Sequence, residues 1–547
     1  MPEYLAPGVY VEEVPSGPVP IEGVSTSTAG FVGLTERGPL LPRMVTSWGD
    51  YQSWFGGIID PATSFLPFAV KGFFDNSGQR LFVARTVVHD AANAGAGAAV
   101  AASLDHPTAD AAQSLVVAAN GPGDWGNRLF LDIAAGSNST VANPTIRVRI
   151  LYYRTMPPLP FVNPFDPANI ANPNRREPAV SEVFDNLGIT STSADYFIPF
   201  ITARSRLVEV EWGDITVAAA RPNDAGGFIQ LDTVAGDDGA GVLASADFLG
   251  DASLPPGTRQ GLAGLADIDP ISILGAPDHA NNVALPNAVD RDALRNAVID
   301  QCEILKDRFA VVCVESGEGD PAAILPPRDS SYAAFYAPWI RVPDPRTNGT
   351  VLVPPIGHIA GVYARTDVER GVHKAPANEV VRGMVTVDIN ATRKPLEFTF
   401  GKREQDILNP RGVNLIRDFR SDRRGIRVYG GRTMASDGTW RYINVRRLLL
   451  FIEESIDEGT QWVVFEPNDE PLWARVRQSV RNFLLLTWRT GALQGSKEEQ
   501  AFFVRCDRTT MTQADIDAGR LICQIGVAPV KPAEFVIFRI QLNTATE

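Results

Sequence analysis

Apolar residues recur along this chain in two patterns, one typical of buried strands and the other of helices. Residues 26–39 predict a strand that leads into a Gly/Pro turn, residues 78–87 and 271–277 predict further apolar strands, and residues 309–315 form a continuous apolar strand. Between the last two runs, apolar residues return at helical spacing: Leu294, Ala297, Val298, Cys302 and Leu305. A strand, a helix and a strand within about 45 residues indicate a βαβ unit with parallel strands. We therefore expect an α/β fold, in which residues 332–342 (YAAFYAPWIRV) add a further strand.

Two segments nearer the end of the chain have the apolar spacing of amphipathic helices. In residues 442–456, one helical face carries Val445, Leu448, Leu449, Ile452 and Ile456. In residues 468–491, the face towards the core carries Trp473, Val476, Val480, Phe483 and Leu484. Asn468 or Asp469 is suited to cap this second helix, and Pro471 falls in its first turn. An α+β domain is therefore expected after the α/β region.

Both ends of the sequence carry short apolar strands that cannot build a core alone. Residues 1–22 hold five prolines around one strand, whose middle is Val9, Tyr10 and Val11. Residues 529–547 contain EFVIFRIQL, a strand with apolar side chains on both faces: Phe535, Val536, Ile537, Phe538 and Ile540. Chain ends usually fray into water, so a strand this apolar needs a partner. We expect both segments to be extended arms.

Length and composition divide the chain into several domains. A chain of 547 residues is too long for one hydrophobic core, and the Ala/Gly-rich residues 91–103 indicate a boundary. Beyond it, short strands alternate with long Pro/Asn loops, which predicts a β-rich domain inserted into the parent fold. The expected domains are a linking arm (1–22), an α/β domain (23–95 plus 265–385), the insertion (96–264), a C-terminal domain (386–528) and a second arm (529–547).

Composition limits the partners of the protein. The chain has 50 basic and 64 acidic residues, and its net charge of −14 argues against general nucleic-acid binding. No apolar run approaches the roughly 18 residues of a membrane helix, and the first residues do not resemble a signal peptide. We expect a soluble protein made in the cytosol, without direct membrane insertion. The cysteines are widely spaced and lack a CxxC pair, which favours reduced, buried thiols over a disulfide or metal site. These cysteines are Cys302, Cys313, Cys506 and Cys523.

The α/β pattern raises the question of an active site, but the residues offer no convincing catalytic set. The five histidines follow no metal-binding spacing: His89, His106, His279, His358 and His373. Residues 430–439 (GGRTMASDGT) are faintly similar to the nucleophile turn of subtilisin-like proteases, but Thr433 stands where the serine should precede methionine. A turn between strands is the simpler interpretation. Residues 235–241 (AGDDGAG) lack the spacing of an EF-hand or a P-loop, which favours an exposed turn. We expect no enzyme activity, cofactor or metal.

Charged residues are segregated in the C-terminal part of the chain. Residues 411–447 carry ten arginines against three acids, a local charge of +7, whereas residues 453–470 carry seven acids and no base. Ten arginines without a lysine suit bidentate pairing with carboxylates. One interpretation is pairing within the domain, and the other is complementary contact between subunits or with an acidic partner. The candidate contact residues are Arg423, Arg424, Arg446, Arg447, Glu453 and Glu454.

Several stretches match, in order, the motifs of one known family. YLAPGVYVEEV is similar to its N-terminal arm, GDWGNRLFLDI to its GxWGN element and GVYARTDVERGVHKAPANE (361–379) to its signature. The order continues with NLIRDF, GIRVYGGRTM, WRYINVRRLLLFIEESI, FEPNDEPLWARVRQSVRNFL, GALQGSKEEQAFFVRCD and DIDAGRLICQIGVAPVKPAEFVIFRI. The match covers both ends and most of residues 265–547 and is weakest across 91–264. The chain thus resembles the tail sheath proteins of contractile phage tails and related contractile injection systems.

This resemblance implies a subtilisin-like α/β domain without protease chemistry, an insertion that faces outward, and a C-terminal domain against an inner tube. It implies a helical homo-oligomer of stacked rings, whose subunits exchange terminal strands and whose contraction drives the tube through a target envelope. Further implied partners are the inner tube protein and the baseplate and terminal cap proteins. Such a particle is assembled in the bacterial cytoplasm and can be released. MPEYLAPGVYVEEVPS is most similar to sheaths of phage-tail-like protein-translocation particles.

Alternative functions stay open at this point. The chain could be the sheath of a true contractile phage, or a subtilisin-like hydrolase, which would need a convergent nucleophile and base. A nucleic-acid-binding function rests on residues 411–447 alone. Because no nucleotide site is evident, the work of contraction is expected to come from contacts between subunits. The six charged residues named above are candidates for setting the balance between the extended and contracted lattices, since weak ion pairs add up when every subunit repeats them.

Overall fold

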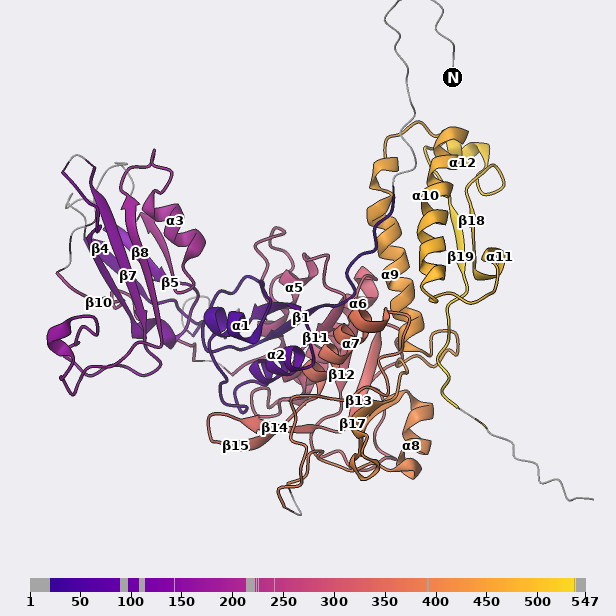
Figure 1. Cartoon of the computed structure of the whole chain (residues 1–547), viewed down its shortest axis with the longest axis horizontal. Coiled ribbons are helices and arrows are strands. Elements are labelled where there is room, and N and C mark those ends of the chain that lie inside the picture. Colours follow the sequence, from indigo (N-terminus) through magenta and orange to yellow (C-terminus); the bar gives the residue numbers. More distant parts are fainter. Residues whose placement is uncertain are drawn as a thin grey trace, which may run out of the picture. The chain divides into compact units, whose positions relative to one another are not determined.

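The computed structural model describes two compact units (Figure 1). The larger unit comprises Thr26–Arg365 and Pro376–Arg441, and the smaller unit comprises Met1–Ser25, Thr366–Ala375 and Tyr442–Glu547. The residues that the structure describes are 20–88, 97–107, 114–141, 143–212, 222, 224, 226–240, 242–390, 393–535 and 537. Among these residues, no helix is long and apolar enough to cross a bilayer.

An eight-stranded sheet forms the centre of the larger unit, in the order β17-β16-β13-β12-β11-β1-β3-β2. Its strands are β1 (Thr28–Gly33), β2 (Arg43–Val45), β3 (Arg80–Arg85), β11 (Ile273–Gly275), β12 (Phe309–Cys313), β13 (Ala333–Ala337), β16 (Val413–Phe419) and β17 (Gly425–Tyr429). The strands from β16 to β3 run parallel, and the two edge strands are antiparallel to their neighbours. β1, β12 and β13 are buried at every position, as strands covered on both faces must be. The α/β class expected from the sequence is confirmed.

Helices accompany this sheet in the larger unit. The main ones are α1 (Trp48–Phe55), α2 (Leu66–Asp75), α5 (Gly261–Ala266), α6 (Ala288–Leu305) and α7 (Ile356–Arg370), which continues into the smaller unit. α6 begins at Asn287, whose side chain caps the helix, and ends where Lys306 adopts a left-handed φ of 62°. Leu294, Val298 and Cys302 are fully buried as predicted. The predicted core position Leu305 is instead 38% exposed, because the helix ends there.

The segment YAAFYAPWIRV, predicted as one strand, forms two strands in different sheets. Its first part is β13 in the central sheet, and its second part is β14 (Ile340–Asp344), which forms a hairpin with β15 (Gly349–Val353). Pro338 lies between the two strands and has no N–H group to continue a ladder of hydrogen bonds. The apolar run therefore predicted the burial correctly but not the break.

Two smaller antiparallel sheets lie between residues 97 and 240, in the orders β10-β6-β7-β8 and β4-β5-β9. Their strands are β4 (Ser103–Pro107), β5 (Ser114–Ala119), β6 (Leu129–Ala135), β7 (Thr145–Tyr152), β8 (Val180–Gly188), β9 (Val208–Trp212) and β10 (Ile229–Gln230). One apolar cluster around Trp125 and Ile150 joins both sheets to helix α3 (Phe197–Arg204). A core of its own is what an inserted domain requires.

The smaller unit packs two long helices, α9 (Ile443–Gly459) and α10 (Glu470–Arg489), with a two-stranded sheet of β18 (Phe502–Arg505) and β19 (Gln524–Val527). The predicted cap of α10 is confirmed, because the Asp469 carboxylate accepts a hydrogen bond from the Leu472 N–H at 2.9 Å. The five apolar residues predicted for its core side are all buried. The same core takes in Ile21 and Val372. Three separated stretches of sequence thus build one core.

The sequence-based boundary at residue 386 does not coincide with a boundary of the structure. β16 pairs in parallel with β13, and β17 pairs with β16, so residues up to Arg441 belong to the larger unit. Shorter helices complete the described parts of the two units: α4 (Ser245–Leu249), α8 (Lys402–Leu408), α11 (Glu498–Ala501) and α12 (Gln513–Asp517).

Two histidines of the larger unit are buried and held neutral. Burial lowers the pKa of both His279 and His358 to about 3. His358 is packed so closely against α2 that a Cβ atom on Gly72 would lie 2.3 Å from the imidazole ring. Burial also favours the neutral form of Asp278. It raises the pKa of this carboxyl to about 6, although Ser64 and the Phe65 N–H donate hydrogen bonds to it.

His358 makes the larger unit sensitive to acid. The unfolded chain protonates this imidazole below about pH 6.5, whereas the folded protein protonates it only near pH 3, so unfolding takes up a proton between these values. Stability therefore falls as the pH falls through this window. The free energy of unfolding should fall between pH 6 and pH 4 in the unmodified chain. In His358→Gln this fall should be smaller by about 2–3 kcal/mol. Urea titrations at each pH measure this, and parallel pH curves would contradict it.

Candidate functional site

The arginines of residues 411–447 do not form one exposed block. Arg447 lies inside the smaller unit, where its guanidinium pairs with the Asp367 carboxylate at 3.0 and 2.7 Å. The two side chains are only 3% and 1% exposed. A two-point contact of this kind satisfies both charges away from water.

Arg446 is buried as well, with 5% of its surface exposed. Burial lowers the pKa of its guanidinium, and the charge of Glu453 partly offsets this. Arg446 and Arg447 are therefore buried within the folded chain, which favours pairing inside the domain, and their contact with other subunits stays a prediction. Both lie in the first two turns of α9, which the smaller unit encloses on more than one side.

Other arginines of this stretch pair within the larger unit. Arg420 binds the carboxylates of Asp418 and Asp388 at 2.6 and 2.8 Å, and these contacts raise its pKa. Arg411 donates to the carbonyl groups of Pro321 and Ala322 at 3.0 and 2.9 Å. Pairing within the domain, one of the two interpretations of the charge pattern, accounts for these residues.

Arg423 and Arg424 are exposed at the turn between β16 and β17. Arg424 donates to the Asn378 side chain at 2.9 Å, and its guanidinium lies 4.8 Å from the centre of the Phe419 ring. On α9, Glu453 is exposed and Glu454 is half-buried. These four residues keep a place at the surface, and their role between subunits stays a prediction.

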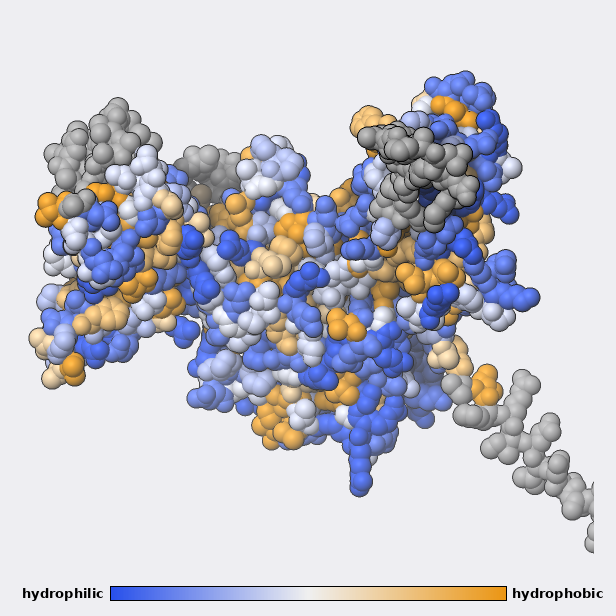
Figure 2. Space-filling view, turned by 45° about the horizontal axis from the view of Figure 1, so that its top comes forward, coloured by the Kyte–Doolittle hydropathy of each residue, from blue (hydrophilic) through white to orange (hydrophobic). Residues whose placement is uncertain are grey.

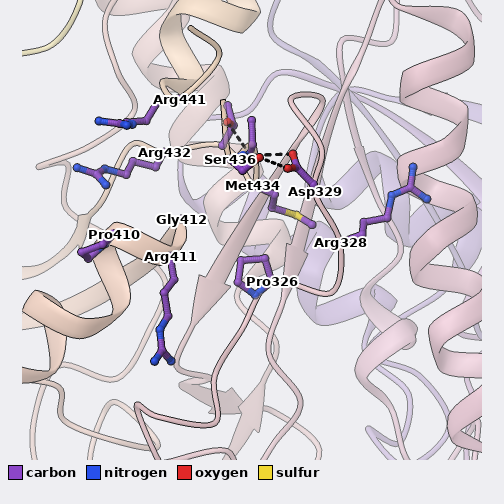
Figure 3. A pocket seen from close by; sticks show the side chains of 12 residues that line it. Pro326, Arg328, Asp329, Pro410, Arg411, Gly412, Arg432, Met434, Ser436 and Arg441 are labelled. Atoms are coloured by element: carbon purple, nitrogen blue, oxygen red, sulfur yellow. Dashed lines mark hydrogen bonds between the residues drawn. The ribbon is translucent and has the colours of Figure 1, made fainter. Parts of the chain in front are cut away.

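A pocket of about 290 Å³ lies where several arginines meet (Figure 3). Its lining residues are Pro326, Arg328, Asp329, Pro410, Arg411, Gly412, Arg432, Thr433, Met434, Ala435, Ser436 and Arg441. They come from the loops before β13 and β16 and the loop after β17, so the pocket lies at the amino ends of the parallel strands. Open α/β sheets bind their ligands outside the carboxyl ends of the strands. The pocket is therefore not in the place of an α/β active site.

Thr433, the residue at the nucleophile-like position, is held in a turn. Its hydroxyl donates to the Trp440 carbonyl at 2.7 Å and accepts a hydrogen bond from the Ala435 N–H at 3.1 Å. The residue is 1% exposed. Beside it, the Ser436 hydroxyl donates to the Asp329 carboxylate. Thr433 thus stabilises the chain segment that forms one wall of the pocket.

The terminal arms lie largely outside the described residues. Val9, Tyr10, Val11, Val536, Phe538 and Ile540 all fall there. The two described members of the set, Phe535 and Ile537, are 72% and 78% exposed. Earlier in the chain, β18 and β19 form a sheet of only two strands among the described residues.

The cysteines are free thiols, as expected, but one of them is not fully buried. Cys302, Cys313 and Cys506 are buried, whereas Cys523 is half-buried. Cys506 directly follows Arg505 at the end of β18, Cys523 directly precedes Gln524 at the start of β19, and Arg505 and Gln524 are paired. The two thiols are hydrogen-bonded, which raises the pKa of Cys506 and lowers that of Cys523.

Comparison with protein families identifies this architecture. Residues 268–434 match the phage tail sheath protein central domain, and residues 435–543 match the phage tail sheath C-terminal domain. Together these matches span about half of the chain. The chain belongs to the phage tail sheath protein family.

Relatives and solved structures agree with this assignment. A putative prophage major tail sheath protein of Pseudomonas aeruginosa (strain UCBPP-PA14) is 25% identical over 299 residues, which cover 52% of this chain and 70% of that protein. The tail sheath protein of Burkholderia phage BcepMu is 26% identical over 234 residues, or 42% of this chain and 46% of that protein. The helical sheath of the anti-feeding prophage in its contracted state shares the fold, with a TM-score of 0.56, 23% identity and coverage of 99% of this chain and 100% of that one. The contracted sheath of an extracellular contractile injection system, PVC, has a TM-score of 0.52 at 21% identity and covers 99% of both chains.

Sequence reasoning missed the partner of Arg447. Asp367 lies in GVYARTDVERGVHKAPANE, the stretch that carried part of the family resemblance, so a signal was present. The partner could not be named, because 80 residues separate the two side chains and no local spacing connects them.

We expect Arg447→Met to destabilise the smaller unit by about 3–5 kcal/mol, because it leaves the Asp367 carboxylate buried without its partner. The double variant Arg447→Met/Asp367→Leu should recover most of that loss. Arg481→Met is the matched control: Arg481 pairs with Glu498 at 2.6 Å, but the two side chains are 44% and 26% exposed. It should cost less than about 1 kcal/mol. Equal losses in chemical denaturation for Arg447→Met and Arg481→Met would contradict the prediction.

Proposed function

We propose that this chain is the structural subunit of a contractile sheath, which polymerises helically around an inner tube and contracts to drive the tube through a target envelope. Membership of the phage tail sheath family supports this role. The inner tube, a baseplate and a terminal cap are the other expected partners. The sheath subunit has a mechanical role and no peptidase chemistry, in keeping with the buried, hydrogen-bonded Thr433.

Exchange of terminal strands between subunits is part of this proposal, and the smaller unit carries the supporting observation. The chain enters this unit at Ile21, which packs in its core, and leaves it near Val530, whose N–H donates to the Ala492 carbonyl at 3.2 Å. Beyond that point Phe535 and Ile537 are exposed. Within the described part of the chain the β18–β19 sheet has two strands, and a further strand can be added to the edge of such a sheet.

A particle that translocates proteins is favoured over the tail of a phage. The anti-feeding prophage and PVC sheaths match 99% of this chain in fold. The first residues, MPEYLAPGVYVEEVPS, which are similar to those of sheaths of protein-translocation particles, support the same choice. The insertion would face outward in such a sheath, which suits its long exposed loops.

Deleting residues 1–19, or residues 536–547, should abolish tube formation and leave the subunit folded. Both deletions spare Ile21 and Val530, so the core of the smaller unit is retained. Electron microscopy measures tube formation, and thermal unfolding measures the fold. As a control, shortening the exposed loop at residues 163–175 should leave tubes intact. Normal tubes from either arm deletion would refute strand exchange.

Limited proteolysis of assembled tubes should cut residues 96–264 before any other region. Loops on the outside of an assembly stay accessible, whereas the α9–α10 region would be covered by neighbouring subunits and the tube. Mass spectrometry of the first fragments identifies the cut site. Early cleavage within residues 440–490, with the insertion intact, would show that the insertion does not face outward.

A further inference from the structure

The turn between α9 and α10 presents a bare aromatic side chain. Hydrophilic residues cover much of the face shown in Figure 2, and apolar residues lie between them in small groups, as on most proteins. Phe465 differs because it is 101% exposed and adopts a left-handed φ of 70°. Its neighbour Val464 is 58% exposed. A bulky residue rarely takes this backbone conformation, and such strain is retained where it serves a function.

The turn that carries Phe465 is firmly held. The Trp462 indole N–H donates to the Gly459 carbonyl at 3.1 Å, and the Glu466 N–H donates to the Val463 carbonyl at 3.1 Å. Asp469 then caps α10. Because both helices pack in one core, the turn offers Phe465 in a fixed direction at little entropic cost.

Acidic side chains surround this aromatic tip. Asp457 and Glu458 are exposed at the end of α9, and Glu466 is exposed directly after Phe465. Glu466 has Arg475 as a partner at 3.0 Å, but both side chains are more than a third exposed, so this pair holds its carboxylate only weakly. The tip is therefore an apolar knob with a negative rim.

The pocket of the larger unit has the complementary character. Pro326, Pro410 and Met434 supply apolar wall, and Arg432 and Arg441 extend in the same direction at its edge in Figure 3. Its volume of about 290 Å³ is near the lower limit for pockets that hold a drug-sized molecule, so one aromatic ring fits.

Arg441 is the cation best placed to receive a carboxylate. It is exposed, and the structure gives its guanidinium no hydrogen bond or ion pair with any described residue. Arg328 extends the other way in Figure 3 and is already paired with Asp300 and Glu303.

We propose that Phe465 of one copy of this chain inserts into this pocket of a second copy, with Glu466 facing Arg441. This proposal rests on the proposed function, because in a lattice of identical subunits one surface of each subunit contacts a different, complementary surface of its neighbour. An aromatic anchor in a pocket with a charged rim is the arrangement that concentrates binding energy in protein interfaces. The acidic rim of the knob favours the arginine-lined pocket as its partner by charge as well as by shape.

The first test is Phe465→Ala in the full-length chain. Because the side chain is fully exposed, thermal unfolding should not change, whereas the protein concentration needed for tube formation should rise at least tenfold. Ile170→Ala, at an exposed apolar position of the insertion, is the control and should assemble as the unmodified chain does. If Phe465→Ala forms tubes at the same protein concentration as the unmodified chain, the proposed contact is refuted. The proposed sheath function is then unaffected.

The second test exchanges the charges. Arg441→Glu and Glu466→Arg should each raise the concentration needed for assembly, and the double variant should restore it towards the original value. If both single variants weaken assembly and the double variant does not restore it, the pocket binds something other than this turn, such as a small anion. That result would overturn the proposal. An unmodified chain that never self-associates would overturn both this contact and the sheath function.

Discussion

Buried polar groups of α9 hold the smaller unit together. Arg447 pairs with Asp367, and the Asn444 side chain donates to the carbonyl groups of His373 and Val530 at 2.8 and 3.1 Å. Separating a buried ion pair has a large free-energy cost, because a charge is left buried without its partner. The pair therefore holds residues 366–375 against α9. The same helix ties down the chain that follows β19. Apolar packing alone is less directional and would not specify these positions.

The sequence predicted those parts of the fold in which burial depends on local spacing. The continuous runs that became β1, β11 and β12 needed no knowledge of distant residues, and neither did the Asp469 cap of α10. The α9 face was predicted only in part. Val445, Leu448 and Ile452 are buried, but so are Asn444, Arg446 and Arg447, while Leu449 and Ile456 are half-buried. A helical wheel assumes one buried face, and a helix enclosed by segments from elsewhere has more than one.

The same limitation explains the mixed outcome for the candidate site. A count of charges along the chain indicates which residues can pair, but the fold decides which of them reach the surface. Residues 411–447 are divided between strands β16 and β17, a pocket wall and a buried helix, so their net charge of +7 is not the charge of any one surface. Exposed arginines of this stretch stand at separate places: Arg423 and Arg424 at one turn, and Arg441 beside the pocket. Contacts in an assembly would use such single points rather than a charged face.

The division of the smaller unit among three stretches of chain has a consequence for synthesis. Ile21 is translated long before β19, and the packing that β19 completes exists only after Val527 has been made. At 5–20 residues per second, the delay between the two is roughly 25 to 100 seconds. The larger unit is complete at Arg441, before either edge of the β18–β19 sheet has formed. A nascent chain therefore cannot offer that sheet to finished copies nearby until Val527 has been made, so joining through this sheet is deferred to that point.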